Sequence, residues 1–127
     1  MNSDDVSEFE RMQTQLEAMY NEIGTLSKKT PDGPINKFKL KLINQVLDDT
    51  NTILGDDYKP FSDFIHFDEN ELPSNSDTVV ILSQYLSSLE KLRCDNIGQA
   101  MGKWYWALDD EDKYIETGPP RKLNYRV

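Results

Sequence analysis

Apolar residues at spacings of three and four run through the first quarter of the chain and constrain its fold most. Between residues 4 and 28 the repeat is unbroken, and its members are Phe9, Met12, Leu16, Met19, Ile23 and Leu26. This period places them on one face of an α-helix. Ser3 is a candidate N-cap, and Lys28 and Lys29 lie where the helix dipole favours cations. A seam of under about three heptads is short for a free-standing coiled coil, so it is expected to pack inside the same chain, with homodimerisation as the alternative.

A second helix is predicted over residues 34–54, after the turn residues Thr30 to Pro34 and before Gly55. The stretch Lys37 to Leu42 alternates between lysine and apolar residues, which taken alone would be a strand, but the alternation stops at Ile43. A helical wheel instead collects the apolar residues on one broad arc, namely Ile35, Phe38, Leu42, Ile43, Val46, Leu47, Ile53 and Leu54. Such an arc suits a central helix with neighbours on two sides.

The third predicted helix, over residues 75–97, is the clearest amphipathic segment. Ser74 followed by Asp77 is a capping pattern, and Gly98 ends the periodicity. Its predicted apolar face consists of Ile81, Leu82, Tyr85, Leu86, Leu89 and Leu92, and its predicted polar face of Ser83, Gln84, Ser87, Glu90 and Lys91. The connector over residues 56–75 carries Phe61, Phe64 and Phe67, which are predicted to form one short helical turn that lays its rings across the bundle.

Aromatic and β-branched residues dominate two runs after Gly102, on either side of the polar residues 109–112. They predict a β-hairpin over about 103–117, followed by a basic tail at 118–127. On a strand, Trp104 and Trp106 share the face expected to cover the bundle, and Tyr105 faces outward. The predicted fold is therefore mainly α: one domain, 1–127, with an antiparallel helical hairpin, a third helix and a C-terminal β-hairpin.

Charge and composition exclude several classes of protein. Lys plus Arg number 14 against 23 Asp plus Glu, so the formal charge is −9, and direct nucleic-acid binding over the whole surface is disfavoured. One Cys and one His do not supply a disulfide framework or a Cys/His metal site. No apolar run is long enough for a membrane span and the acidic first residues do not read as a leader, so a cytoplasmic, membrane-free protein is expected.

No residue pattern predicts catalysis, a cofactor or a metal. His66 is the only imidazole, and Cys94 is expected to be an inert thiol near a helix end. The acidic clusters lack the glycine and the terminal glutamate of a calcium loop. An enzyme that uses a carboxylate pair such as Asp56 and Asp57 stays formally open, although adjacent carboxylates do not by themselves make an acid and a base.

The hypothesis that fits best is a non-enzymatic acidic interaction protein that binds, and by binding inhibits or assembles with, a larger macromolecule. Its profile is that of immunity proteins, phage or defence antagonists and nucleic-acid mimics, so a basic or nucleic-acid-binding protein is the expected partner. The predicted contact residues are Tyr105, Tyr114, Arg121, Asp68, Glu69, Glu71, Asp109, Asp110 and Asp112. The alternative is a nucleic-acid-associated subunit that uses the basic stretch from Lys28 to Lys41.

Overall fold

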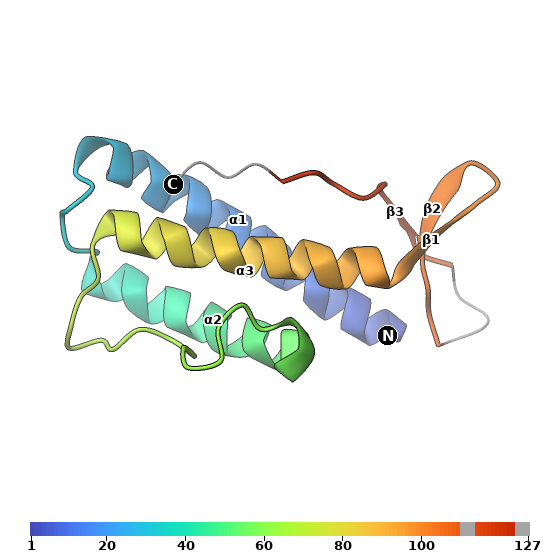
Figure 1. Cartoon of the computed structure of the whole chain (residues 1–127), viewed down its shortest axis with the longest axis horizontal. Helices are drawn as coiled ribbons and strands as arrows, with labels where there is room; N and C mark the ends of the chain where they lie inside the picture. The colour runs from blue at the N-terminus through green and yellow to red at the C-terminus, as the bar shows by residue number, and fades with distance from the viewer. Residues whose placement is uncertain (110–113, 124–127) are drawn as a thin grey trace.

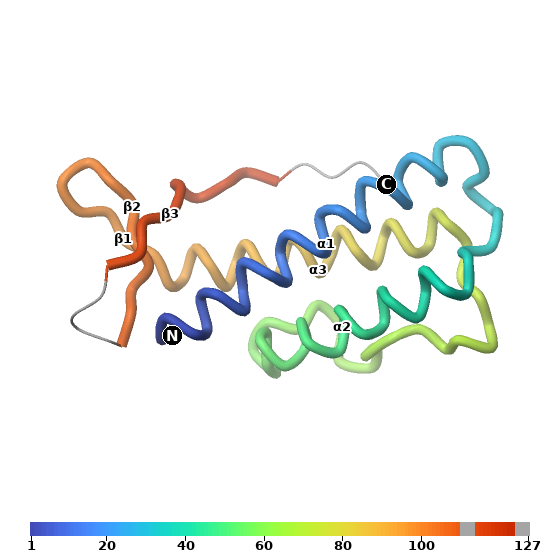
Figure 2. Tube along the Cα trace, turned by 180° about the vertical axis from the view of Figure 1, so that it is seen from behind, coloured from blue at the N-terminus to red at the C-terminus, as the bar shows by residue number. Residues whose placement is uncertain are grey.

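Three helices lie side by side in the computed structural model of the chain, which describes residues 1–109 and 114–123 (Figure 1). They are α1 (Ser3–Lys29), α2 (Lys37–Tyr58) and α3 (Asn75–Asp95). Helices α1 and α2 form the predicted antiparallel hairpin, and α3 packs against both. A small sheet stands at the end of the bundle where α3 ends and α1 begins (Figure 2). The predicted bundle with a C-terminal hairpin is confirmed.

The caps explain where the helices begin. Asn2, not the predicted Ser3, is the N-cap of α1: its side chain accepts the Asp5 N–H, and the Asp5 carboxylate accepts the Asn2 N–H, both at 2.9 Å. Asn36 caps α2 by accepting the Phe38 and Lys39 N–H groups, so this helix begins three residues after Pro34. In both helices the amide oxygen of the capping asparagine accepts N–H groups that would otherwise have no partner, and this fixes the residue at which the helix begins.

Gly55 interrupts α2 at the position where the sequence predicts its end. Its φ of 62° and ψ of −173° are non-helical, and one further turn carries the chain on to Tyr58. This backbone region is essentially restricted to glycine. The interruption therefore redirects the chain into the connector.

The core consists of the apolar faces of the three helices. The seam of α1 is confirmed, with Phe9, Met12 and Leu16 fully buried and Met19 and Leu26 packed at its margin. The arc predicted for α2 is partly wrong, because Phe38 is 70% exposed and Leu42 40% exposed. The buried apolar residues of α2 are Leu40, Ile43, Val46, Leu47 and Leu54, of which Leu40 was not in the predicted arc. Both α1 and α3 pack against α2, but Phe38 and Leu42 stay in solvent.

Two residues of α3 that the sequence placed on a polar face are buried. Ser83 and Glu90 are each 4% exposed. The Ser83 hydroxyl donates to the Val80 carbonyl at 2.7 Å, which satisfies it within the helix. Glu90 is covered because the chain after the sheet returns along the bundle above it (Figure 1).

The connector between α2 and α3 covers the bundle with its aromatic rings but contains no helical turn, so that part of the prediction is wrong. Phe64 packs edge-on against Phe61 and Phe67 and at a tilt against Tyr85, with ring centroids 5.0–6.4 Å apart. The Asn44 side chain exchanges two hydrogen bonds with the backbone of Phe67, each 2.9 Å long. The Asn44 amide of α2 thus satisfies the backbone N–H and C=O groups of Phe67, which in a helical turn would be paired within the turn itself.

The sheet has one strand more than predicted. Its antiparallel strands, in spatial order, are β1 (Ile97–Ala100), β2 (Lys103–Trp106) and β3 (Glu116–Thr117). The predicted hairpin is the β2–β3 pair, and β1 occupies residues that the sequence assigned to the end of a helix and a breaker. Met101 and Gly102, with φ of 52° and 79°, make the two-residue turn between β1 and β2. Positive φ at both positions is typical of the tight turns that join twisted strands.

Candidate interaction surface

The sheet presents two different faces. Trp106 points into the bundle, is 4% exposed, and packs edge-on against Phe9 with ring centroids 5.1 Å apart. Trp104 lies on the same face and is half-buried. The opposite face carries Gly98, Ala100, Tyr105, Ala107 and Tyr114, and we call these five residues the outer sheet face. The predicted division is confirmed for Trp106, which belongs to the core, and for Tyr105 on the opposite face, whereas Trp104 keeps partial exposure.

A hollow of about 650 Å³ opens beside the outer sheet face, and Gln99, Met101 and Trp106 also line it. Its floor is made of small residues, because Gly98 and Ala100 of β1 and Ala107 after β2 carry little or no side chain. Tyr105 and Tyr114 form one wall, with their rings edge-to-face at 6.2 Å, and Tyr114 is 82% exposed. The Met101 side chain at the tip is fully exposed. Aromatic and methionine side chains around an apolar hollow are typical of contact surfaces.

The described members of the predicted acidic contacts do not lie together. Asp109 lies at the sheet end, where its carboxylate is 3.2 Å from the N-terminal amine and 82% exposed. Asp110 and Asp112 lie outside the described residues. Asp68, Glu69 and Glu71 lie in the connector as it approaches the turn between α1 and α2, where the Ile35 N–H donates to the Pro73 carbonyl. One compact partner contact therefore does not include both acidic groups.

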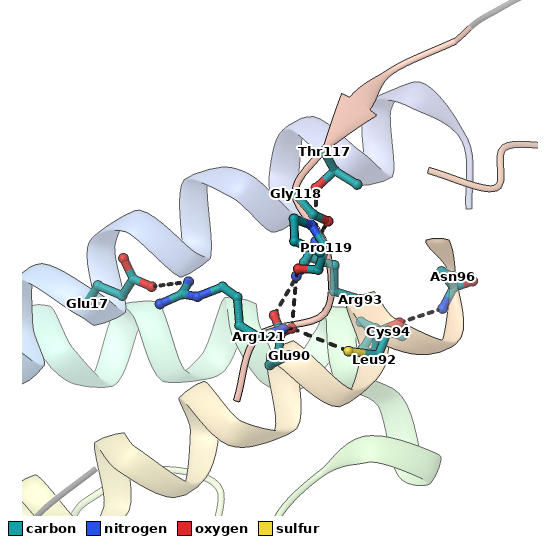
Figure 3. A network of polar contacts seen from close by, with 10 residues as sticks. All are labelled: Glu17, Glu90, Leu92, Arg93, Cys94, Asn96, Thr117, Gly118, Pro119 and Arg121. Atoms are coloured by element: carbon teal, nitrogen blue, oxygen red, sulfur yellow. Dashed lines mark hydrogen bonds and ion pairs between the residues drawn. The ribbon is translucent and has the colours of Figure 1, made fainter. Parts of the chain in front are cut away.

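Arg121 does not join the tyrosines, contrary to the sequence-based expectation. Its guanidinium contacts Glu17 of α1 at 3.1 Å, and its backbone N–H donates to the Glu90 carboxylate at 2.7 Å (Figure 3). Residues 117–121 run back along the bundle from the sheet, and this direction carries Arg121 away from the outer sheet face (Figure 1). Arg121 therefore helps to hold residues 117–121 against α1 and α3.

A buried ion pair on α3 anchors the returning segment. The Arg93 guanidinium makes two hydrogen bonds to the Glu90 carboxylate, 2.8 and 2.9 Å long, and both side chains are about nine-tenths buried or more. It also donates to the Thr117 hydroxyl and to the Gly118 and Pro119 carbonyls at 2.7–3.0 Å (Figure 3). We call these residues, with the Arg121 N–H, the Arg93 clamp. The sequence analysis missed it, and the only signal was the i, i+3 spacing of the pair.

The clamp also sets the protonation of its acidic member. Burial alone would raise the pKa of Glu90, but hydrogen bonds from Arg93, Arg121 and Cys94 and the charge of Arg93 hold it below its ordinary value. The neighbouring Cys94 thiol donates to the Glu90 carboxylate. Burial and this carboxylate together raise the pKa of the Cys94 thiol. A raised pKa is the opposite of what a nucleophilic thiol needs.

The other candidate reactive groups do not converge. His66 lies on the surface with its Nδ1 2.8 Å from Asp48, and no nucleophile accompanies this pair in the contacts of the described residues. Asp56 pairs with Lys59 on the turn after Gly55. Within residues 1–109 and 114–123, no group of three or more His, Cys, Asp or Glu side chains is arranged to hold a metal ion. None of the described helices is long and apolar enough to cross a membrane.

No protein-family model, curated protein or solved structure matches this chain. Functional inference therefore rests on the surfaces described above. At the outer sheet face an exposed tyrosine, a half-buried tyrosine, small residues and a hollow coincide. The sequence predicted its two tyrosines as contact residues but not Gly98 and Ala100, because their glycine-flanked run was interpreted as a break between elements.

Proposed function

We propose that the protein is a non-catalytic binding protein that docks onto a larger macromolecular partner through its outer sheet face. The observation that supports this most is the hollow between Gly98, Ala100 and the Tyr105–Tyr114 pair. The exposed Tyr114 and the half-buried Tyr105, beside small residues, offer large, rigid contact area at low entropic cost. The formal charge of −9 suits a basic partner, such as a nucleic-acid-binding protein whose site the bound domain would block.

Removing either tyrosine of the outer sheet face is expected to weaken partner binding. Tyr105→Ala and Tyr114→Ala should each lose at least about 1 kcal/mol of binding free energy, because exposed aromatic anchors dominate interfaces. Thermal stability should stay within a few degrees of wild type, as expected for surface substitutions. The measurement is quantitative affinity capture from lysate of the source cells, followed by titration of the captured protein.

Phe38→Ala is the matched control, because Phe38 is also an exposed aromatic side chain but lies at the opposite end of the bundle. Capture should be unchanged by this variant. Equal capture by wild type and both tyrosine variants would show that the outer sheet face is not the contact.

The acidic surface is expected to make association strongly dependent on salt. Binding to a basic partner should weaken steeply as ionic strength rises, because the Debye length is only about 10 Å at 0.1 M. Reversing the charges of Asp109, Asp110 and Asp112 should weaken binding more than reversing those of Asp68, Glu69 and Glu71, since only the first group is close in sequence to Tyr114 at the sheet end. If the affinity does not change from low to high salt, the acidic residues do not contribute to binding and only keep the protein in solution.

The alternative is a nucleic-acid-associated subunit, and one observation favours it. Lys28 and Lys29 end α1, and Lys37, Lys39 and Lys41 lie in the first turns of α2, so all five lie at the end of the bundle that also carries the exposed Phe38, although Lys39 pairs with Glu22 at 2.9 Å. An exposed aromatic ring among lysines suits stacking on single-stranded nucleic acid. Filter binding of labelled oligonucleotides at low salt tests it: retention that Lys37→Glu and Lys41→Glu abolish would favour this function over the first.

A further inference from the structure

Strand β1 forms one edge of the sheet, and among residues 1–109 and 114–123 no backbone group pairs with its outer side. We propose that this edge accepts an extended segment of the partner protein as a fourth strand, whose side chains fill the hollow beside the outer sheet face. The inference rests on the proposed function, because it specifies how that face is engaged.

The hydrogen-bond pattern of the β1–β2 pair identifies the groups that are available. The two-residue turn makes Ala100 and Lys103 a hydrogen-bonded pair, and the bond from the Ala107 N–H to the Asn96 carbonyl, 2.7 Å long, fixes the same pattern at the other end. Gly98 therefore bonds inward to Tyr105, whereas Ile97 and Gln99 direct their N–H and C=O groups outward. In the described part of the chain these outward groups have no backbone partner.

Nothing in the composition of β1 protects this edge. Natural edge strands commonly carry a lysine, a proline or a bulge that prevents further pairing. The sequence of β1 is Ile-Gly-Gln-Ala, without charge or proline, and its last three residues are exposed. The opposite edge is different, because β3 has two residues and is followed by Gly118, Pro119 and Pro120. An added strand therefore fits β1 and not β3.

The side chains beside this edge indicate what the added strand carries. Alternate residues of a strand next to β1 would lie beside Gly98 and Ala100, over the hollow and against Tyr105. A volume of about 650 Å³ with a floor of small residues accommodates aromatic or long aliphatic side chains. The expected ligand is an extended peptide segment with such a side chain at every second residue.

A second copy of this chain is a poorer occupant than a partner segment. Antiparallel pairing of two β1 strands about Gln99 would place Gly98 opposite Ala100 of the other copy, small residue against small residue, and leave the hollow unfilled. Two copies that each carry a charge of −9 also repel each other.

The test uses a phage-displayed library of random linear peptides selected on the full chain. We expect the enriched peptides to alternate large apolar side chains with other residues. Their affinity, measured by fluorescence polarisation, should fall about tenfold or more for Gln99→Pro, which removes one outward N–H and obstructs pairing. Gln99→Ala is the matched control, because it keeps the N–H, and it should bind as wild type does. N-methylation of alternate peptide amides should abolish binding to the unmodified protein, whatever the stability of the variants.

Several outcomes would overturn the inference. These are a failure to enrich any peptide, enriched peptides that bind Gln99→Pro as tightly as wild type, and a concentration-dependent dimer in sedimentation that Gln99→Pro abolishes. The test separates this inference from the proposed function. If Tyr105→Ala and Tyr114→Ala weaken partner capture but Gln99→Pro does not, the outer sheet face binds without strand addition.

Discussion

The Arg93→Met variant is expected to lose about 3–5 kcal/mol of unfolding free energy, the cost of removing one member of a buried ion pair. The substitution would leave the Glu90 carboxylate buried with only the Arg121 N–H and the Cys94 thiol as donors. It would also remove every hydrogen bond that Arg93 makes to residues 117–119. Chemical denaturation followed by circular dichroism measures the effect.

Two variants show whether the loss comes from the buried pair. Arg11→Met breaks the exposed pair with Glu8 and should cost far less than Arg93→Met, because solvent screens that pair. The double variant Glu90→Leu/Arg93→Met should recover much of the lost stability, because it no longer buries an unpaired charge. If Arg93→Met costs no more than Arg11→Met, the clamp does not contribute to stability.

The clamp also predicts a dependence of stability on pH. Because the pKa of Glu90 is lower in the folded protein than its ordinary value of 4.5, its contribution is fully present above about pH 4.5 and is lost as the pH falls through the folded pKa. The difference in unfolding free energy between wild type and Glu90→Gln should therefore be largest near neutral pH and shrink in acid. Denaturation series from neutral to acid pH test this, and a difference that is constant over that range would contradict it.

Truncation of the buried face of α3 is the second large effect. Leu86→Ala and Leu89→Ala should each cost about 2–5 kcal/mol, the range for emptying a packed core position. Leu89 is fully buried and Leu86 is 2% exposed, so neither cavity opens to solvent. The measurement is the denaturant midpoint at unchanged slope.

The matched control on the same helix is Val80→Ala, because Val80 is 39% exposed. Its effect should stay within about 0.5 kcal/mol. Unchanged midpoints for both leucine variants would remove these residues from the core and contradict the packing of the bundle.

Local signals were sufficient for most of the fold. The seam from Phe9 to Leu26, the face from Leu82 to Leu92 and the interruption at Gly55 are each read from a few neighbouring residues, and each agrees with the structure. Aromatic alternation likewise identified β2, with Trp106 turned inward and Tyr105 outward. These features follow from helix and strand periods, which act over a few residues.

Other features depend on which distant segments meet. Phe38 belongs to the predicted apolar arc of α2, but no neighbouring element among the described residues covers it, and its ring is 70% exposed. The helical period of α3 predicts that Glu90 is exposed, but it is buried because residues 117–121 return over it. Asp109 lies at the sheet end, whereas Asp68, Glu69 and Glu71 lie in the connector, although the sequence predicts the same role for all four.

By itself the sequence determined the three helices, the hairpin of β2 and β3 and the identity of the exposed tyrosines, because periodicity and turn residues encode them locally. Only the tertiary structure decided that Ile97–Ala100 becomes an edge strand, that Arg93 and Glu90 form a buried clamp, and that small residues of β1 and the tyrosines enclose one hollow. The physical reason is that each of these depends on pairing across the chain. The residues of one segment alone do not determine its backbone hydrogen bonds, desolvation or side-chain contacts with a distant segment.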